Sequence, residues 1–293
     1  MSDATAPLTA AGVDRTRIRR GRAFHAFLLF SVAIGFVLLI TLLVDVAIDG
    51  IPQLTWHFLT SAPSTLPERA GLRVAILGSI FLGLLLIAFT VPIGVATAIY
   101  LEEYANRERW YNKALEVNIQ NLAAVPSIVY GILGLAFLVR GLEMGRVLLA
   151  GALILTLLVL PTVIVASREA IRAVPDGIRQ GSLALGATQW QTIWRQVLPA
   201  AIPGIATGSI LALARAIGET APLLLVGALT FVSFNPTLLG PFTAIPIQIF
   251  QWVSRPQAEF KLLAAGAIIV LLIILLAMNS FAVWLRNRHT REY

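Results

Sequence analysis

The sequence lacks cysteine altogether and is poor in charge. Without cysteine it has no disulfide framework, no thiolate nucleophile and no cysteine metal site. Only 13% of its 293 residues are charged and 58% are hydrophobic, whereas soluble globular domains have about 25% charged and about 45–50% apolar residues. Since so few charged side chains do not cover a water-facing surface of this size, we exclude soluble and disordered proteins.

The motifs of common catalytic classes are missing as well. The histidines, His25, His57 and His289, all lie away from the middle of the apolar runs, which disfavours an intramembrane Ser–His protease. The chain has no HExxH motif, and neither Lys113 nor Lys261 follows the GxxxxG of a phosphate-binding loop. We therefore expect no catalytic residue, no metal site and no bound cofactor in this chain. If transport consumes ATP, a partner polypeptide must bind the ATP and its Mg²⁺.

Long apolar stretches are what the sequence has instead. A helix needs about 20 such residues to cross a bilayer. The stretches lack the alternation of barrel strands, so helices are the remaining way to satisfy the backbone in lipid. The sequence predicts an all-α polytopic membrane protein with six transmembrane helices, at residues 24–44, 74–101, 117–139, 147–167, 200–229 and 262–285.

The basic residues predict the orientation of these helices. Lys and Arg number 22 against 15 Asp and Glu, a net charge of +7, and most of them fall in four segments that alternate helices place on one side. These segments are residues 15–22, 107–113, 168–195 and 286–291. Because cytoplasmic loops of membrane proteins are rich in Lys and Arg, we expect both termini inside the cell. The lipid bilayer, and not a nucleic acid, is therefore the expected partner of the basic chain.

These features divide the chain into three parts. We expect a cytoplasmic N-terminal tail at residues 1–22, a retained first transmembrane helix at 23–47, and a core of five transmembrane helices at 70–293. The core contains a cytoplasmic loop at residues 168–199, here called the long loop. An outer segment at 231–260 is expected to be extended and then to form a short helix, which packing explains better than substrate contact.

The second half of the long loop has a helical pattern. From Gly177 to Pro199 it predicts two short helices joined at Gly186–Ala187, with small and apolar residues turned toward the cytoplasm. Such a surface must be covered, either by the helices of the bundle or by a partner protein, and we favour the partner.

A charged pair interrupts the fifth apolar stretch. An arginine at the centre of a bilayer costs about 2.5–3.5 kcal/mol on insertion scales, so Arg215 should face a bundle interior or an aqueous cavity. Glu219 follows at four residues, on the same helical face, although the order Arg then Glu is the weaker one. The pair is either an anion site on a transport path, since arginine matches oxyanion geometry, or an ion pair that fastens helices or subunits. The residues leave both open.

Polar residues also interrupt the third apolar stretch. Asn121 precedes Pro126, which must disturb the helix, and Ser127 and Tyr130 follow it. These side chains either line the same cavity as the charged pair or join neighbouring helices by hydrogen bonds.

The long loop resembles the EAA loop of ABC importer permeases. Members of that family carry E-A-A, three residues, a glycine, nine residues and I-x-L-P. Here Gly186 and Leu198–Pro199 stand at the matching spacing, residues 180–182 (Gln-Gly-Ser) replace E-A-A, and Gln196 replaces the isoleucine.

Further motifs narrow the resemblance to the PstA family of phosphate importer permeases, from about residue 70 to the C-terminus. They are YLEEYA (100–105), VPSIVYG (125–131), SLALGAT (182–188), ARAIGETAPLL (214–224) and PIQIFQW (246–252). This resemblance implies a type I ABC importer permease with the MetI-like fold, in a bacterial or archaeal inner (plasma) membrane. It also implies a pore shared with a PstC-like permease, a homodimeric ABC ATPase docked on residues 177–199, and an external phosphate-binding protein.

The resemblance also assigns residues. Arg215 and Glu219 match charged positions of the family's pore helix; we expect Arg215 to contact phosphate transiently and Glu219 to balance its charge. Asn121, Ser127 and Tyr130 complete the expected substrate pathway. The residues expected to couple to the ATPase are Ser182, Leu183, Ala184, Leu185, Gly186, Ala187 and Thr188.

Other functions fit the sequence less well. A permease for sulfate, molybdate or phosphonate remains an alternative within ABC importers. An ion-coupled transporter working alone predicts charged residues in several spans and an inverted repeat, and a membrane-embedded enzyme predicts a nucleophile–base or metal constellation. The sequence shows none of these features.

Overall fold

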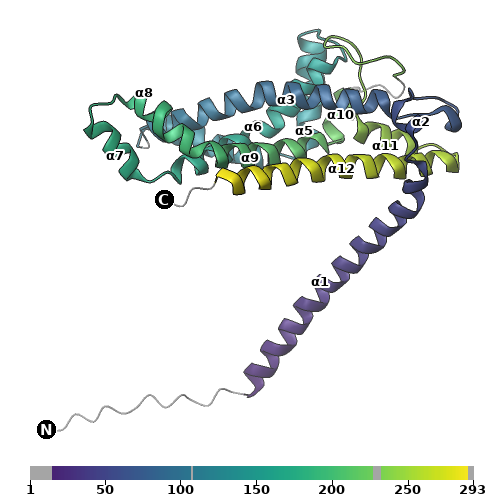
Figure 1. The fold of residues 1–293 in the computed structure, drawn as a ribbon, viewed down its shortest axis with the longest axis horizontal. Helices are drawn as coiled ribbons and strands as arrows, with labels where there is room; N and C mark the ends of the chain where they lie inside the picture. Colours follow the sequence, from purple (N-terminus) through teal and green to yellow (C-terminus); the bar gives the residue numbers. More distant parts are fainter. Residues whose placement is uncertain (1–14, 107, 227–231, 290–293) are drawn as a thin grey trace. The chain divides into compact units, whose positions relative to one another are not determined.

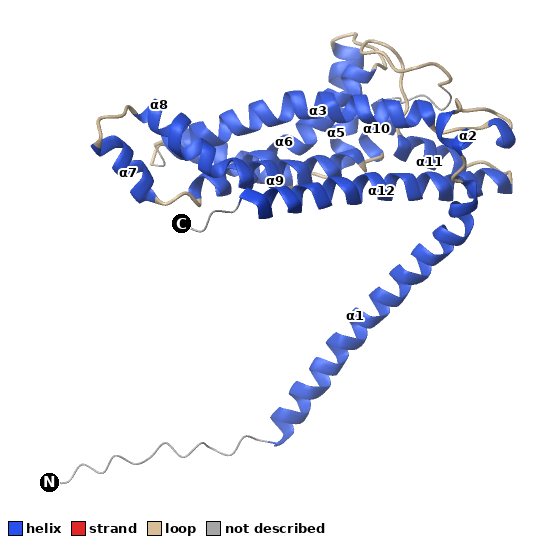
Figure 2. Cartoon of the chain, viewed as in Figure 1, coloured by secondary structure: helices blue, strands red, loops and turns tan. Residues whose placement is uncertain are grey.

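The computed structural model describes residues 15–106, 108–226 and 232–289. These residues form α-, 3-10 and π-helices joined by loops, with no strand among them (Figure 2), which confirms the all-α class. The chain divides into two compact units, residues 1–48 and residues 49–293.

The described part of the first unit is one long helix. Helix α1 runs from Arg15 to Gly50 and contains the apolar stretch predicted as the first span. The predicted N-terminal tail is therefore helical from Arg15 onward, while residues 1–14 lie outside the described part. Its side chains from Arg20 to Val44 are exposed, as suits a helix surrounded by lipid.

Four long helices form the frame of the second unit. They are α3 (Arg73–Ile99), α6 (Leu148–Arg172), α9 (Leu198–Ile217) and α12 (Ala258–His289). Helix α6 packs between α3 and α9, and α12 lies against α9 (Figure 1). Their apolar side chains meet in one central cluster that includes fully buried Leu86, Leu148 and Val163.

Small residues bring α6 and α9 together. A Cβ atom on Gly204 would lie 2.8 Å from the Cβ of Ala170, and one on Gly208 would lie 2.6 Å from the Cβ of Ala166. Close approach of backbones through small residues is the usual way in which membrane helices pack. Gly208 and Gly204 therefore mark the closest approach of these two helices that glycine makes possible.

The third predicted span is bent and does not form one straight helix. Helix α4 (Trp110–Ala123) and helix α5 (Ser127–Gly134), which continues as the π-helix η4 (Leu135–Gly141), meet at an angle of 101°. Pro126 lacks an N–H and lies at the N-cap of α5. The break between the two helices is therefore at the residue that the sequence predicted to disturb the helix. Among the described residues, five helices are long and apolar enough to span a membrane, or up to six if this bent pair counts as one.

The fifth predicted span is also interrupted. Helix α9 ends at Ile217 with Gly218 as its C-cap, and a separate helix, α10 (Ala221–Val226), follows. The predicted span over 200–229 is therefore not one straight helix, because the chain turns at Gly218. Residues 227–229 lie outside the described part. Helix α10 packs on α5, where a Cβ on Gly131 would lie 2.7 Å from the Cα of Pro222.

Short elements close one end of the frame. They comprise η1 (Ile51–Gln53), α2 (Trp56–Thr60), η2 (Pro67–Arg69) and α11 (Ile245–Val253). Phe58 of α2 and Trp252 of α11 are fully buried with their ring centroids 5.9 Å apart, in a cluster shared with Phe260 of α12. Packing therefore accounts for the segment around α11.

The other end of the frame carries the long loop. Helix α3 continues into the π-helix η3 (Tyr100–Tyr104), and after α6 come α7 (Asp176–Ala184) and α8 (Gln189–Thr192). Helix α8 runs through the π-helix η5 (Ile193–Val197) directly into α9. The two predicted short helices are thus present, and the second is the beginning of the α9 span.

Candidate functional site

A cavity of about 220 Å³ opens where the broken helices meet. The residues around it come from three places: the break between α4 and α5, the middle of α6, and the end of α9 with the turn that follows. Ser127, Thr162, Arg215 and Glu219 supply its polar side chains. Each break ends or begins a helix at the cavity, which brings polar backbone groups to its wall.

Arg215 lies in the last turn of α9, and Glu219 lies beyond the helix end. The Arg215 Nε is 3.8 Å from the Glu219 Oε1, and the arginine side chain is 80% exposed whereas that of the glutamate is 22% exposed. The turn places them together: the Gly218 and Glu219 N–H groups donate to the Arg215 and Ala216 carbonyls. The two side chains therefore lie on the same cavity wall. They do not share one continuous helical face, which is what the sequence had predicted, because α9 ends at Ile217. The position of the arginine at a helix C-terminus is electrostatically favourable.

Exposure of Arg215 bears on the two interpretations of the pair. Glu219 is its near sequence neighbour, so within the described residues this ion pair does not fasten one long helix to another. The arginine side chain lines the cavity and is 80% exposed. This geometry therefore favours a role of Arg215 in anion binding over an ion pair that joins two helices of this chain.

The structure brings three of the five expected pathway residues together. Ser127, Arg215 and Glu219 all line the cavity. Asn121 is an exposed residue in the last turn of α4 and is not among the lining residues, and Tyr130 is buried with its hydroxyl donating to the Leu122 carbonyl at 2.9 Å. For Tyr130 this hydrogen bond across the helix break agrees with the alternative of a structural role.

Thr162 is a cavity residue that the sequence reasoning missed. It lies in the middle of α6, one residue after Pro161, and it is exposed toward the cavity. A hydroxyl beside a proline inside an unbroken apolar run was the available signal.

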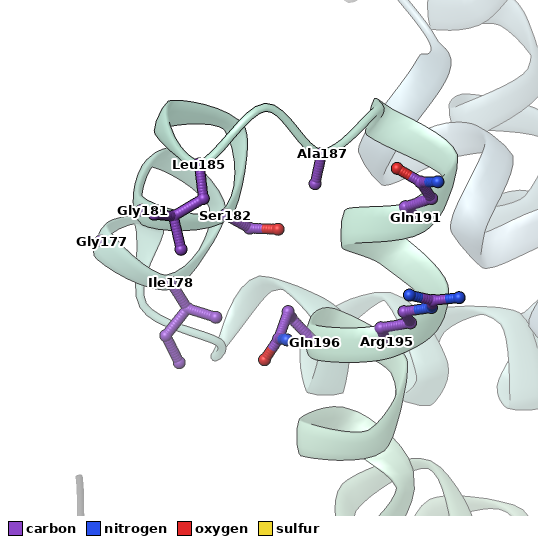
Figure 3. Close-up of a pocket in the computed structure, with 9 residues that line it drawn as sticks. All are labelled: Gly177, Ile178, Gly181, Ser182, Leu185, Ala187, Gln191, Arg195 and Gln196. Atoms are coloured by element: carbon purple, nitrogen blue, oxygen red, sulfur yellow. The ribbon is translucent and has the colours of Figure 1, made fainter.

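The long loop forms a second concave region. An open notch of about 450 Å³ lies between α7 on one side and α8 with η5 on the other (Figure 3). Ser182, Leu185 and Ala187 of the expected coupling residues line it, together with Arg195 and Gln196 from η5. The turn between the two helices depends on glycine, because Gly186 has a φ of +86°.

Large apolar side chains surround this notch without being covered. Leu185 is 91% exposed, and Leu183, Trp190 and Trp194 are exposed too. The loop itself is well formed, since Thr188 caps α8 through a reciprocal capping box with Gln191. An ordered apolar surface of this kind is typical of a site that another protein covers.

Two adjacent acidic residues hold the long loop to the frame. Glu102 and Glu103 of η3 accept from arginines of α6 and α7: Arg172 Nε lies 3.0 Å from Glu102 Oε1, and Arg179 Nη2 lies 2.9 Å from Glu103 Oε1. The sequence reasoning used this acidic pair only as part of a resemblance. Its signal was the combination of adjacent acids at the end of one span with several arginines in a later loop.

Comparisons with known proteins agree with this geometry. A sequence family described as "Binding-protein-dependent transport system inner membrane component" matches residues 90–291. The chain belongs to this family. It is therefore a multi-pass permease subunit of an ABC importer, which places it in the inner membrane, and it is not itself an enzyme. The alternative of an ion-coupled transporter working alone is excluded by this membership.

Relatives in the family share about a third of their residues with this permease. "Probable ABC transporter permease protein YqgI" of Bacillus subtilis is 33% identical over 86% of this chain and 90% of its own. "Phosphate transport system permease protein PstA" of Mycobacterium leprae is 34% identical over 95% of this chain and 92% of its own. "Phosphate transport system permease protein PstA 1" of Mycobacterium tuberculosis H37Rv is 34% identical over 79% of this chain and 75% of its own.

Solved structures confirm the fold of the permease. A bacterial alginate ABC transporter, in complex with its alginate pentasaccharide-bound periplasmic protein, aligns with a TM-score of 0.67 at 18% identity, over 94% of this chain and 98% of that chain. The inward-facing MetNI methionine ABC transporter aligns with a TM-score of 0.58 at 18% identity, over 73% and 92%. The predicted MetI-like permease fold is thereby confirmed.

Proposed function

We propose that this permease carries inorganic phosphate across the membrane through the cavity at Arg215. The supporting observation is the exposed guanidinium of Arg215 at the meeting point of the helix breaks, in a chain whose relatives include phosphate transport permeases. Five N–H donors in a planar fork match the oxygens of a phosphate. Ser127 adds the N-terminus of α5, where unpaired backbone N–H groups and the helix dipole favour an anion.

Glu219 has the opposite effect in this proposal. Its carboxylate, 3.8 Å from the Arg215 Nε, competes with the anion for the guanidinium and repels it. A transport site must bind strongly enough to admit the anion and weakly enough to release it. Glu219 therefore limits how long phosphate stays on Arg215.

The proposed assembly contains three further kinds of protein. A PstC-like permease forms the other half of the pore, and an external binding protein delivers phosphate. In support of such a partner, the solved alginate ABC transporter is in complex with an alginate pentasaccharide-bound periplasmic protein. A homodimeric ABC ATPase covers the exposed apolar side chains around residues 182–188 of the long loop. ATP and Mg²⁺ are bound there, on the ATPase and not on this chain. Both termini and the long loop lie on the cytoplasmic side.

The substrate is tested with the assembled transporter in proteoliposomes. ATP hydrolysis is measured with the binding protein loaded with phosphate, sulfate, molybdate or a phosphonate. We expect stimulation with phosphate; equal or greater stimulation with another anion would make this chain a permease for that oxyanion instead.

The role of Arg215 is tested in the same system. Hydrogen bonds to charged groups contribute about 1.5–3 kcal/mol, so Arg215→Ala should slow phosphate transport by roughly 10- to 150-fold. Arg140→Ala removes an exposed arginine that is not part of the cavity and should transport normally. Wild-type transport by the assembled Arg215→Ala transporter would refute the proposed site.

A further inference from the structure

Helix α7 of the long loop has few apolar attachments to the frame. None of its residues is buried. Only one residue of α7, the partly buried Ile178, packs against the apolar cluster around Ala98 and Ile171. The long frame helices are fixed by fully buried side chains, and α7 has no equivalent. Polar contacts therefore decide how firmly α7 is connected.

Arg179 makes most of these polar contacts. Its Nε and Nη2 donate to Glu103 Oε1 at 3.1 and 2.9 Å, and its Nη1 and Nη2 donate to the carbonyls of Val174 and Ile171 at 2.6 and 2.9 Å. The carbonyl of Ile171 belongs to the last turn of α6, where arginine side chains often satisfy free carbonyl groups. One guanidinium thus joins α7, the end of α6 and the π-helix η3.

Glu103 also reaches the other arm of the long loop. Its backbone carbonyl accepts from the Gln189 Nε2 of α8 at 2.6 Å. Its carboxylate is almost buried and holds Arg179, 76 positions later in the chain. Helices α7 and α8, which form the notch of Figure 3, therefore both contact the same residue of η3, the continuation of α3.

The rest of η3 is held just as closely. Glu102 receives two hydrogen bonds from Arg172, so η3 is bound to the end of α6 as well as to the long loop. A movement of η3 is consequently transferred to α3, of which it is the direct continuation.

We infer that Glu103 is a positioning residue that connects the long loop to α3 and makes α3 follow the loop when the loop moves. The inference rests on the proposed docking of an ATPase on this loop. Displacement of α8 reaches α9 through η5, whereas displacement of α7 reaches η3 and α3 through the Arg179–Glu103 contact. Since α3 and α9 both pack against α6, which lines the Arg215 cavity, the contact makes both walls of the frame respond together.

The test uses the assembled transporter with Glu103→Gln, which keeps the size of the side chain and removes its charge. We expect the ATPase to copurify and its hydrolysis without binding protein to be unchanged. The number of phosphate ions transported per ATP hydrolysed should fall at least about 10-fold, because α7 moves without α3.

Asp176→Asn provides the matched control. The Asp176 Oδ1 also lies 3.2 Å from the Arg179 Nη1, but Asp176 belongs to α7 itself, so this contact does not connect the loop to another part of the protein. This variant should keep the wild-type ratio of transport to hydrolysis.

A covalent replacement of the contact gives an independent readout. The chain has no cysteine. In the double variant Glu103→Cys/Arg179→Cys, a short thiol-reactive cross-linker can therefore react at one pair of sites in this subunit. With partner subunits that are free of reactive cysteine, the reduced double variant should show the low ratio. Cross-linking should restore at least half of the wild-type ratio, which a loss of local stability alone would not predict.

The outcomes separate this inference from the proposed function. A wild-type transporter that phosphate-loaded binding protein does not stimulate would contradict the proposed function, and this inference with it. Normal wild-type stimulation would contradict the inference alone if Glu103→Gln keeps the full ratio, if it loses the ATPase, or if cross-linking has no effect.

Discussion

Replacing Glu102 by glutamine removes the acidic group that holds the end of α6 to η3. The carboxylate is 5% exposed, with Arg172 Nε at 3.0 Å and the 9% exposed Arg168 Nε at 3.5 Å. Breaking a buried ion pair costs about 3–5 kcal/mol because a charge is left without its partner. That range is an upper limit here, since Arg172 is half exposed and keeps Glu169, and Arg168 keeps Glu116 at 2.9 Å. We expect a loss of about 2–3 kcal/mol.

Thermal unfolding of the detergent-solubilised protein measures this loss. In soluble domains of about 150–250 residues, 1 kcal/mol lowers Tm by roughly 2–4 °C, so Glu102→Gln should unfold roughly 5–10 °C earlier than the wild type. Glu116→Gln is the matched variant: it removes a contact to the same Arg168, but Glu116 is 38% exposed, and the expected loss is about 1 kcal/mol or less. Equal Tm shifts for the two variants, or none for Glu102→Gln, would refute the argument from burial.

Three further substitutions test the long loop and the frame. Leu185→Asp should leave folding unchanged and weaken ATPase copurification by roughly 10- to 100-fold, because burying an exposed leucine side chain contributes about 1.5–3 kcal/mol. Leu239→Asp, at another exposed leucine, should have no effect on copurification. Gly186→Ala should strain the turn by about 1–2 kcal/mol at its φ of +86° and lower binding-protein-stimulated hydrolysis, while Gly181→Ala, on α7 with open space around it, should be tolerated. Gly78→Ala should abolish the folded, monodisperse protein on size-exclusion chromatography, since its Cβ would collide with the Thr243 carbonyl oxygen.

Hydrophobicity in the sequence was sufficient to find the membrane helices and the two short helices of the long loop. It was not sufficient for their ends, because an apolar run does not show where the chain turns inside it. Pro126 predicted a disturbance of the helix, but it did not predict the 101° angle between α4 and α5 or the packing of α5 on α10. Helix α9 likewise ends at Gly218, inside the apolar stretch, and hydrophobicity alone does not show that end.

The sequence predicted those site residues that are chemically unusual for their surroundings. It did not predict contacts between residues that lie far apart in the chain. Arg215 and Glu219 stood out because charge inside an apolar stretch is costly, and both do line a cavity. The contacts of Glu103 could not be predicted in this way, since its partner Arg179 lies 76 positions away and neither residue is unusual at a helix end. Tyr130 shows the converse case: its hydroxyl suggested a cavity, whereas the fold uses it to cap a helix break.

The π-helix η5 fixes the rotational phase between the long loop and the Arg215 helix. A π-helical turn holds one residue more than an α-helical turn, and each residue of an α-helix corresponds to about 100° of rotation. If the same five residues, Ile193–Val197, closed as a regular α-helix, the docking surface would be rotated by roughly a quarter turn about the axis of α9, although every residue of both sites would still be present. Deleting one residue together with the π-turn would instead nearly keep the phase, because the wide turn holds about one residue more per turn. A length difference of one residue at this point can therefore be absorbed without turning the docking surface away from the Arg215 helix.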